Sequence, residues 1–272
     1  MSLMNTPSVD MPQEIQPLLD EYCTLTHKQL PNLIGAVYLH GSIALGAFDL
    51  HHSDIDFVTM INRRCTAHDL NTLAEIHHHL AQKYAQWTMD GSYLQWDDLG
   101  KMPEEIEPHP HVNNVFRPTI QGNGGRVMWW ILKQNGVAVV GKDPKLLDID
   151  VDWDALIADM HHNLNTYWKR FIREPRRIAW LYADDGIEWT VLGVLRQYYT
   201  FREDDIISKI GAGNYGLHHL PHHWHPIIQE AIHIRQRNPS SLYLLRVHRM
   251  IIAWRFLRYV IGICNLELTA AR

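Results

Sequence analysis

Hydrophobic positions in the first half of the chain follow two alternating patterns. Short apolar runs at 34–39 (IGAVYL) and 55–61 (IDFVTMI) are bounded by turn-forming or charged residues, which is typical of buried strands. At 12–30 and 66–84, apolar residues recur every three or four positions, which predicts helices with one buried face. The alternation of the two patterns favours an α/β arrangement.

Weaker patterns extend this arrangement toward residue 140. We predict a third strand at 86–95, a helix at 126–135 and a short strand at 137–140. Between the third strand and that helix, four prolines predict loops around short, irregular strands: Pro103, Pro108, Pro110 and Pro118. We therefore expect a small mixed sheet with helices.

The second half of the chain shows helical periodicity throughout. Its predicted helices are 153–173, 187–202, 206–217, 222–236 and 240–263. The change of pattern falls between 141 and 152. We therefore predict an α/β N-terminal domain over residues 1–150 and an all-α C-terminal helical domain over residues 151–272.

Composition places the chain among globular proteins. Of its 272 residues, 46% are hydrophobic and 20% are charged, which excludes disordered and fibrous classes. No apolar run approaches the ~20 residues that span a bilayer, and no signal peptide opens the chain, so we expect a cytoplasmic protein without membrane contact. Its cysteines lie far apart and favour neither a disulfide framework nor a zinc site.

Charge divides unevenly between the two halves. The chain has 18 acidic and 10 basic residues up to Asp150, but 12 acidic and 15 basic residues from Val151 onward. Solvated surface charge explains such a division by itself, yet an acidic half also disfavours a nucleic-acid polymer. A cleft between two halves of opposite net charge suits a divalent cation, a polyphosphate and a cationic small molecule. The oligomeric state is left open.

The segment 37–60 (VYLHGSIALGAFDLHHSDIDFVTM) holds the clearest candidate chemistry. Asp54 and Asp56 stand two apart at the start of a predicted strand, so their side chains point to the same face. Neighbouring carboxylates repel each other unless a cation lies between them, and paired oxygen ligands favour Mg²⁺. The pair therefore predicts a magnesium site, although an isolated pair of this kind more often caps a turn.

A Gly-Ser pair strengthens the functional interpretation. Gly41 and Ser42 end the preceding predicted strand, 12 residues before the two aspartates. A glycine lets a phosphate approach the backbone closely. Ser42, as a predicted helix N-cap, would add a hydroxyl and leave N–H groups directed at the same anion. Together the two motifs predict a site for a metal-bound phosphate.

These motifs resemble those of a known family. The spacing GS-x(11)-D-x-D resembles the signature of the polymerase-β-like nucleotidyltransferases. Residues 188–209 (EWTVLGVLRQYYTFREDDIISK) are similar to a helix with a central Arg and a following Ser-Lys pair in the streptomycin/spectinomycin adenylyltransferases. The resemblance covers nearly the whole chain. It implies a nucleotidyltransferase domain followed by a helical domain, with ATP as co-substrate and Mg²⁺ as cofactor.

The resemblance also implies roles for individual residues. Asp54 and Asp56 match metal-binding carboxylates, and Asp90, on the third predicted strand, matches a general base that is usually Glu. The residues that match contacts to the nucleotide are Ser42, Ser53, Arg196 and Lys209. We add Gly41 to the nucleotide-binding residues because it directly precedes Ser42. The two basic residues belong to the helical domain and would reach the triphosphate across a cleft.

The chain departs from the family at the implied acceptor site. Where streptomycin-modifying members carry an acidic residue before the Arg-bearing helix, this chain has Gly186, and Trp189 stands at a histidine position. Nearby acidic side chains could replace the missing charge: Asp184, Asp185 and Glu188. We therefore expect acceptor binding by these acids and Trp189.

The chain has nineteen histidines, and ten of them cluster at 77–79, 161–162 and 218–225. Such clusters can bind metals, but no cysteine or carboxylate completes a tetrahedral zinc set at the usual spacing. We interpret these histidines as solvated turn residues.

The reaction that these motifs favour is Mg-dependent transfer of AMP from ATP to a hydroxyl of an aminoglycoside-type antibiotic, with release of pyrophosphate. Two alternatives stay open. One is a nucleotidyltransferase that modifies a protein or tRNA in a toxin–antitoxin-like system. The other is a catalytically silent protein that only binds a nucleotide.

Overall fold

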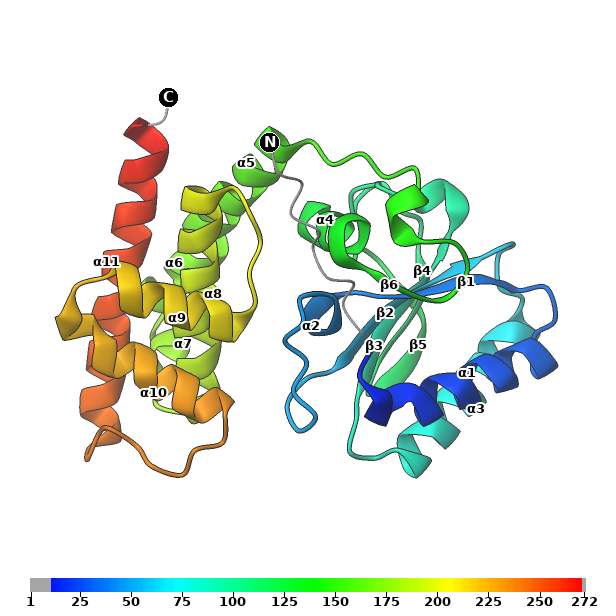
Figure 1. The fold of residues 1–272 in the computed structure, drawn as a ribbon, viewed down its shortest axis with the longest axis horizontal. Coiled ribbons are helices and arrows are strands. Elements are labelled where there is room, and N and C mark those ends of the chain that lie inside the picture. The colour runs from blue at the N-terminus through cyan, green and yellow to red at the C-terminus, as the bar shows by residue number, and fades with distance from the viewer. Residues whose placement is uncertain (1–10, 271–272) are drawn as a thin grey trace. The chain divides into compact units, whose positions relative to one another are not determined.

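The computed structural model describes residues 11–270, and side chains as far as residue 266 (Figure 1). The chain divides into two compact units, of which the first ends at Asp152 and the second begins at Trp153. Within the described residues, no helix is both long enough and apolar enough to cross a bilayer.

The first unit is built on a mixed sheet of six strands in the order β5-β4-β3-β2-β1-β6. The strands are β1 (Ile34–Leu39), β2 (Ile55–Ile61), β3 (Met89–Gln95), β4 (His109–Asn113), β5 (Val115–Ile120) and β6 (Val137–Val140). Strands β2 and β3 pair in parallel, and the other neighbouring pairs are antiparallel. The predicted mixed sheet is therefore confirmed.

Helices cover both faces of this sheet (Figure 1). They are α1 (Gln16–Gln29), α2 (Gly41–Ala44), α3 (Ala67–Lys83) and α4 (Arg126–Asn135), with short 3-10 turns η1 (Gln13–Ile15), η2 (Trp96–Asp98) and η3 (Pro144–Leu146). Alternate residues of a strand face opposite sides, so Phe57 packs in one core with α1 and α3, whereas Val58 packs in another with Trp129 of α4. The second face also carries the candidate chemistry.

A buried polar network joins α1, α3 and the sheet. The Tyr22 hydroxyl lies 2.9 Å from Thr59 Oγ1 and donates to the Tyr93 hydroxyl at 3.0 Å, and His77 Nε2 lies 2.6 Å from that same Tyr93 oxygen. Burial lowers the pKa of His77 to about 3. His77 is therefore a neutral core residue, which corrects the interpretation of its cluster as solvated.

We expect His77 to make the first unit lose stability in mild acid. The folded-state pKa is lowered, so the unfolded chain binds a proton that the folded chain excludes as the pH falls below about 6.5. The linkage predicts a loss of about 2 kcal/mol at pH 5. Urea unfolding between pH 7 and pH 5 should show a shallower pH dependence for His77→Gln than for wild type. His78→Gln, at an exposed position of the same helix, should keep the wild-type slope; equal slopes in both variants would contradict the assignment.

The second unit is entirely helical. Its elements are α5 (Trp153–Asn163), the π-helical segment η4 (Leu164–Trp168), α6 (Lys169–Arg173), α7 (Pro175–Trp180), α8 (Asp184–Glu203), α9 (Lys209–His219), the 3-10 turn η5 (His222–Trp224), α10 (His225–Arg235) and α11 (Arg246–Ala270). Helix α8 packs against α9, α10 and α11 through its buried apolar residues (Figure 1). The predicted all-α region is therefore confirmed.

Two helices of this unit start later than predicted. The helix predicted at 206–217 begins at Lys209, after the Ser208 side chain accepts from the Gly211 N–H. The pattern predicted a helix from Ser240, but α11 begins at Arg246. The Ser241 hydroxyl and the Leu242 N–H both donate to the carboxylate of Glu230, each at 2.7 Å. The Glu230 carboxylate lies on α10 and is buried. Because Ser241 and Leu242 donate to it, the segment before Arg246 stays irregular instead of extending α11 toward its N-terminus.

Candidate functional site

The three aspartates predicted in the first unit come from neighbouring strands. Asp56 on β2 and Asp90 on β3 are direct partners in the parallel register. Asp54 immediately precedes β2, and its charge acts on Asp90. Burial, and secondly this charge, raise the pKa of Asp90. A carboxylate with a raised pKa is a better proton acceptor, which agrees with the general-base hypothesis.

The turn after β1 packs directly against Asp56. Gly41 has φ = +57°, and a Cβ built on it would lie 2.6 Å from Asp56 Cγ. The His40 N–H also donates to the Asp56 carbonyl at 3.0 Å. Only glycine satisfies both the positive φ and the close approach, so the position of Asp56 requires a glycine at residue 41.

Ser42 does not occupy the predicted N-cap position. His40 is the N-cap of α2, and Ser42 is the second residue of that helix. Its Oγ is buried and has no hydrogen-bond partner among the described residues. A buried hydroxyl without a partner is costly, so a polar ligand atom there would satisfy it.

Ser53 stabilises the turn that leads to Asp54. Its Oγ accepts a hydrogen bond of 3.0 Å from the Asp49 N–H, and the residue is buried. This bond shows a local structural role for Ser53, in addition to the nucleotide contact that the resemblance implies.

Two residues of β4, which the sequence patterns did not indicate, lie beside Asp90. Asn113 Nδ2 donates to Asp90 Oδ2 at 2.6 Å, and His111 Nε2 lies 3.6 Å from Asp90 Oδ1. The alternation in HPHVN would have placed both side chains on one face, but only the pairing of β4 with β3 brings that face to Asp90.

In the second unit, the candidates Glu188, Trp189 and Lys209 lie together. Glu188 Oε1 accepts from Lys209 Nζ at 2.9 Å and from Arg235 Nη1 at 3.2 Å. The same ammonium lies 5.1 Å from the ring centroid of Trp189, which is exposed. Arg235 was missed because it comes from α10, far along the chain from α8.

The other candidates of this unit lie on or near α8. Arg196 donates from Nε to the Ile207 carbonyl at 2.9 Å, which links α8 to the segment before α9. Asp185 is exposed in the first turn of α8. A Cβ on Gly186 would lie 2.7 Å from the backbone carbon of Trp180, so this backbone excludes any side chain at Gly186.

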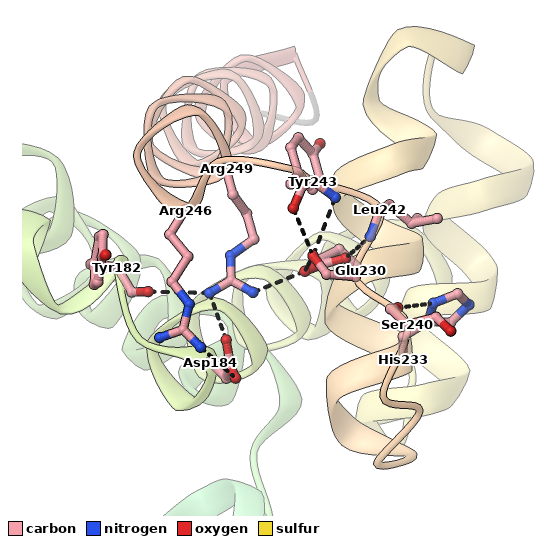
Figure 2. A network of polar contacts seen from close by, with 10 residues as sticks. Tyr182, Asp184, Glu230, His233, Ser240, Leu242, Tyr243, Arg246 and Arg249 are labelled. Carbon is pink, nitrogen blue, oxygen red and sulfur yellow. Dashed lines mark hydrogen bonds and ion pairs between the residues drawn. The ribbon is translucent and has the colours of Figure 1, made fainter.

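Asp184 belongs to the polar network shown in Figure 2. Its Oδ1 accepts from Arg249 Nη2 at 2.6 Å, and the same nitrogen donates to the Tyr182 carbonyl at 3.1 Å. Arg249 also donates from Nη1 to Glu230 at 2.8 Å, and these two residues are almost fully buried. Asp184 thus fixes the start of α8 to α11.

We expect Arg249→Met to destabilise the second unit by about 3 to 5 kcal/mol, because it leaves the Glu230 carboxylate buried without its cation. Arg246→Met is the matched control, since Arg246 is exposed and lies 3.9 Å from Asp184, and it should cost less than about 1 kcal/mol. Urea unfolding of both variants measures the difference. Similar losses in the two variants would contradict the prediction.

The first unit has a donor set that suits a metal bound together with phosphate. Among the described residues, no group of three or more His, Cys, Asp or Glu side chains forms a metal cluster. Mg²⁺, however, commonly takes only one or two carboxylates and completes its shell with phosphate oxygens and water. Asp54 and Asp56, with Gly41 packed against Asp56 and the buried Ser42 hydroxyl nearby in sequence, fit such a group.

The mixed sheet with its adjacent aspartates and glycine turn, followed by helices, is a fold that this chain shares with a solved adenyltransferase. Residues 175–242 match the sequence model described as aminoglycoside adenylyltransferase, C-terminal domain. The chain also resembles the crystal structure of spectinomycin adenyltransferase AAD(9) from Enterococcus faecialis with ATP and spectinomycin. The TM-score is 0.67 at 13% identity, over 90% of this chain and 98% of that chain. No curated protein matches the sequence.

The two matches are complementary. The first match lies within the helical unit, and the second shows a similar fold over 90% of the chain. The family match and the structural match together confirm the resemblance to nucleotidyltransferases that the sequence predicted.

Proposed function

We propose that this chain transfers AMP from ATP, with Mg²⁺, to a hydroxyl of an aminoglycoside-type antibiotic and releases pyrophosphate. The observation that carries the proposal is the register of β2 and β3, which sets Asp56 beside Asp90 with Gly41 against Asp56. The family match of residues 175–242 supports the antibiotic class of acceptor. The solved relative was crystallised with ATP and spectinomycin, which supports the same pair of substrates.

In this proposal, residues 1–150 form the nucleotidyltransferase domain and residues 151–272 the helical domain. Asp54 and Asp56 would hold Mg²⁺, which supplies neutralisation of the phosphate charge when bound. Ser42 would offer its buried hydroxyl to a phosphate oxygen. Asp90 would accept the proton of the attacking hydroxyl on a carboxylate oxygen.

The helical unit supplies charges of both signs in this proposal. Lys209 and Arg196 would stabilise the phosphates electrostatically. Glu188 already binds two cations, so Asp185, which is exposed, is the better placed of the two acids to attract a cationic acceptor.

Incubation of the purified protein with Mg-ATP and a panel of antibiotics tests the proposal. Spectinomycin, streptomycin and other aminoglycosides are scored for pyrophosphate release and for an AMP adduct by mass spectrometry. An adduct on one drug, with resistance in a sensitive host, supports the proposal. AMP found on protein or tRNA instead, or nucleotide binding without pyrophosphate release, would replace it with the corresponding alternative.

A further inference from the structure

The sheet face that carries the aspartates continues into a second row of polar side chains. In the first row, Asp56 on β2, Asp90 on β3 and Asn113 on β4 are successive partners. In the next row, Ser92 on β3 is the partner of His111 on β4. Residues two apart in a strand share a face. Ser92 therefore lies next to Asp90 on the same face of β3, and His111 lies next to Asn113 on the same face of β4.

The hydrogen bonds of this second row fix the tautomer of His111. The Asn123 side-chain amide donates from Nδ2 to Ser92 Oγ at 3.1 Å. The same amide nitrogen, which can only donate, lies 3.3 Å from His111 Nδ1, and Ser92 Oγ lies 3.1 Å from that ring nitrogen. Nδ1 is then an acceptor, and the ring carries its single proton on Nε2.

His111 Nε2 is the nitrogen that faces Asp90. It lies 3.6 Å from Oδ1, while Asn113 donates to Oδ2 at 2.6 Å. His111 is buried, and burial, followed by the nearby His109 and Arg117, lowers its pKa, which favours the neutral ring, while a hydrogen bond to the Gly91 backbone acts in the opposite direction. Asn113 therefore hydrogen-bonds one oxygen of Asp90, and Nε2 of His111 faces the other oxygen just beyond hydrogen-bond distance.

We propose that His111 is a positioning residue for Asp90 in the proposed reaction, and that Ser92 and Asn123 hold His111 in the tautomer required for this. Two neutral donors fix the plane of a carboxylate without adding a positive charge, which would weaken it as a base. The proposal rests on the proposed function, in which Asp90 accepts the proton of the acceptor hydroxyl.

Substitution of His111 tests the positioning role by kinetics. His111→Phe keeps a ring but removes the donor, and it should lower kcat by about 10- to 100-fold with little change in KM for Mg-ATP. His111→Gln, which can place an N–H near the position of Nε2, should restore most of this loss. His109→Phe is the matched control, because His109 is also buried on β4 but binds the Glu107 carbonyl instead of Asp90.

A double-variant cycle separates positioning from general damage. In an Asp90→Asn background, His111→Phe should have almost no further effect, because both changes act through the same carboxylate. An equal loss in both backgrounds, or no recovery in His111→Gln, would overturn the proposal.

The tautomer gives a readout on the resting protein. Long-range ¹H–¹⁵N spectra should show His111 protonated on Nε2 in wild type, and a shift toward the Nδ1-protonated form in Ser92→Ala. A wild-type ring protonated on Nδ1 would overturn the inference whatever the activity. An active wild type with unaffected His111 variants would refute this inference alone, whereas failure to modify any acceptor would refute the proposed function together with the role of His111 in it.

Discussion

Asp56→Asn should reduce AMP transfer by roughly 10³-fold or more, because a site with one carboxylate fewer binds Mg²⁺ poorly and leaves the phosphate charge unbalanced. Asparagine has nearly the same shape as aspartate, so the packing against Gly41 is preserved. Pyrophosphate release measured across a range of Mg²⁺ concentrations checks the prediction, and Asp54→Asn should behave alike.

Two controls separate loss of the metal site from a general effect of the lost charge or from unfolding. Asp20→Asn removes the same charge from an exposed position on α1 of the same unit and should leave turnover unchanged. The melting temperature of Asp56→Asn should stay close to wild type. Near-normal turnover of a folded Asp56→Asn protein would show that the metal assignment is wrong.

Asp90→Asn should lower kcat by roughly 10²-fold or more and leave the affinity for Mg-ATP almost unchanged. The reason is that a base on the acceptor hydroxyl acts in the chemical step, whereas the nucleotide is held by metal and phosphate contacts. Steady-state kinetics with a saturating acceptor, together with a binding isotherm for Mg-ATP, separate the two effects.

Asp90→Glu gives the sharper discrimination, since the sequence resemblance implies a Glu as the base at this position. It should keep substantial activity because the carboxylate stays on the same face of β3. The competing interpretation, that Asp90, Gly91 and Ser92 form a bulge or turn, is not what the structure shows, because all three pair in an unbroken register with β2. A silent Asp90→Asn, or an Asp90→Glu no better than other substitutions, would refute the base assignment.

Local sequence was enough to predict most elements of the fold. The strands at 34–39 and 55–61 have the predicted bounds because each apolar run is closed by a turn or charged residue. The helix predicted at 66–84 begins where the Thr66 side chain caps the N–H of Asp69, which is again a local contact. Such signals lie within a few residues of the elements that they delimit.

Three differences from prediction involve partners distant in sequence, whereas the N-cap of α2, at His40 instead of Ser42, is a local difference. Ser240 was predicted to be helical, but the buried Glu230 holds the following residues in another conformation. His77 was assigned to solvent, whereas Tyr93 on β3 accommodates it in the core. His111 reaches Asp90 only through strand pairing. Each of these three cases required knowledge of the tertiary register, which no periodicity contains.

In the proposed function, in which the start of α8 binds the acceptor, Gly186 limits how the acceptor range can change in evolution. A single substitution that introduced an acidic side chain there would drive its Cβ into the Trp180–Leu181 backbone, so the α7–α8 turn would first have to shift. The obstacle to an acidic side chain at this position is steric, and at least two substitutions would be needed to overcome it. Changes at the exposed Asp185 and Trp189 meet no such obstacle, so selection for a new acceptor would act there first.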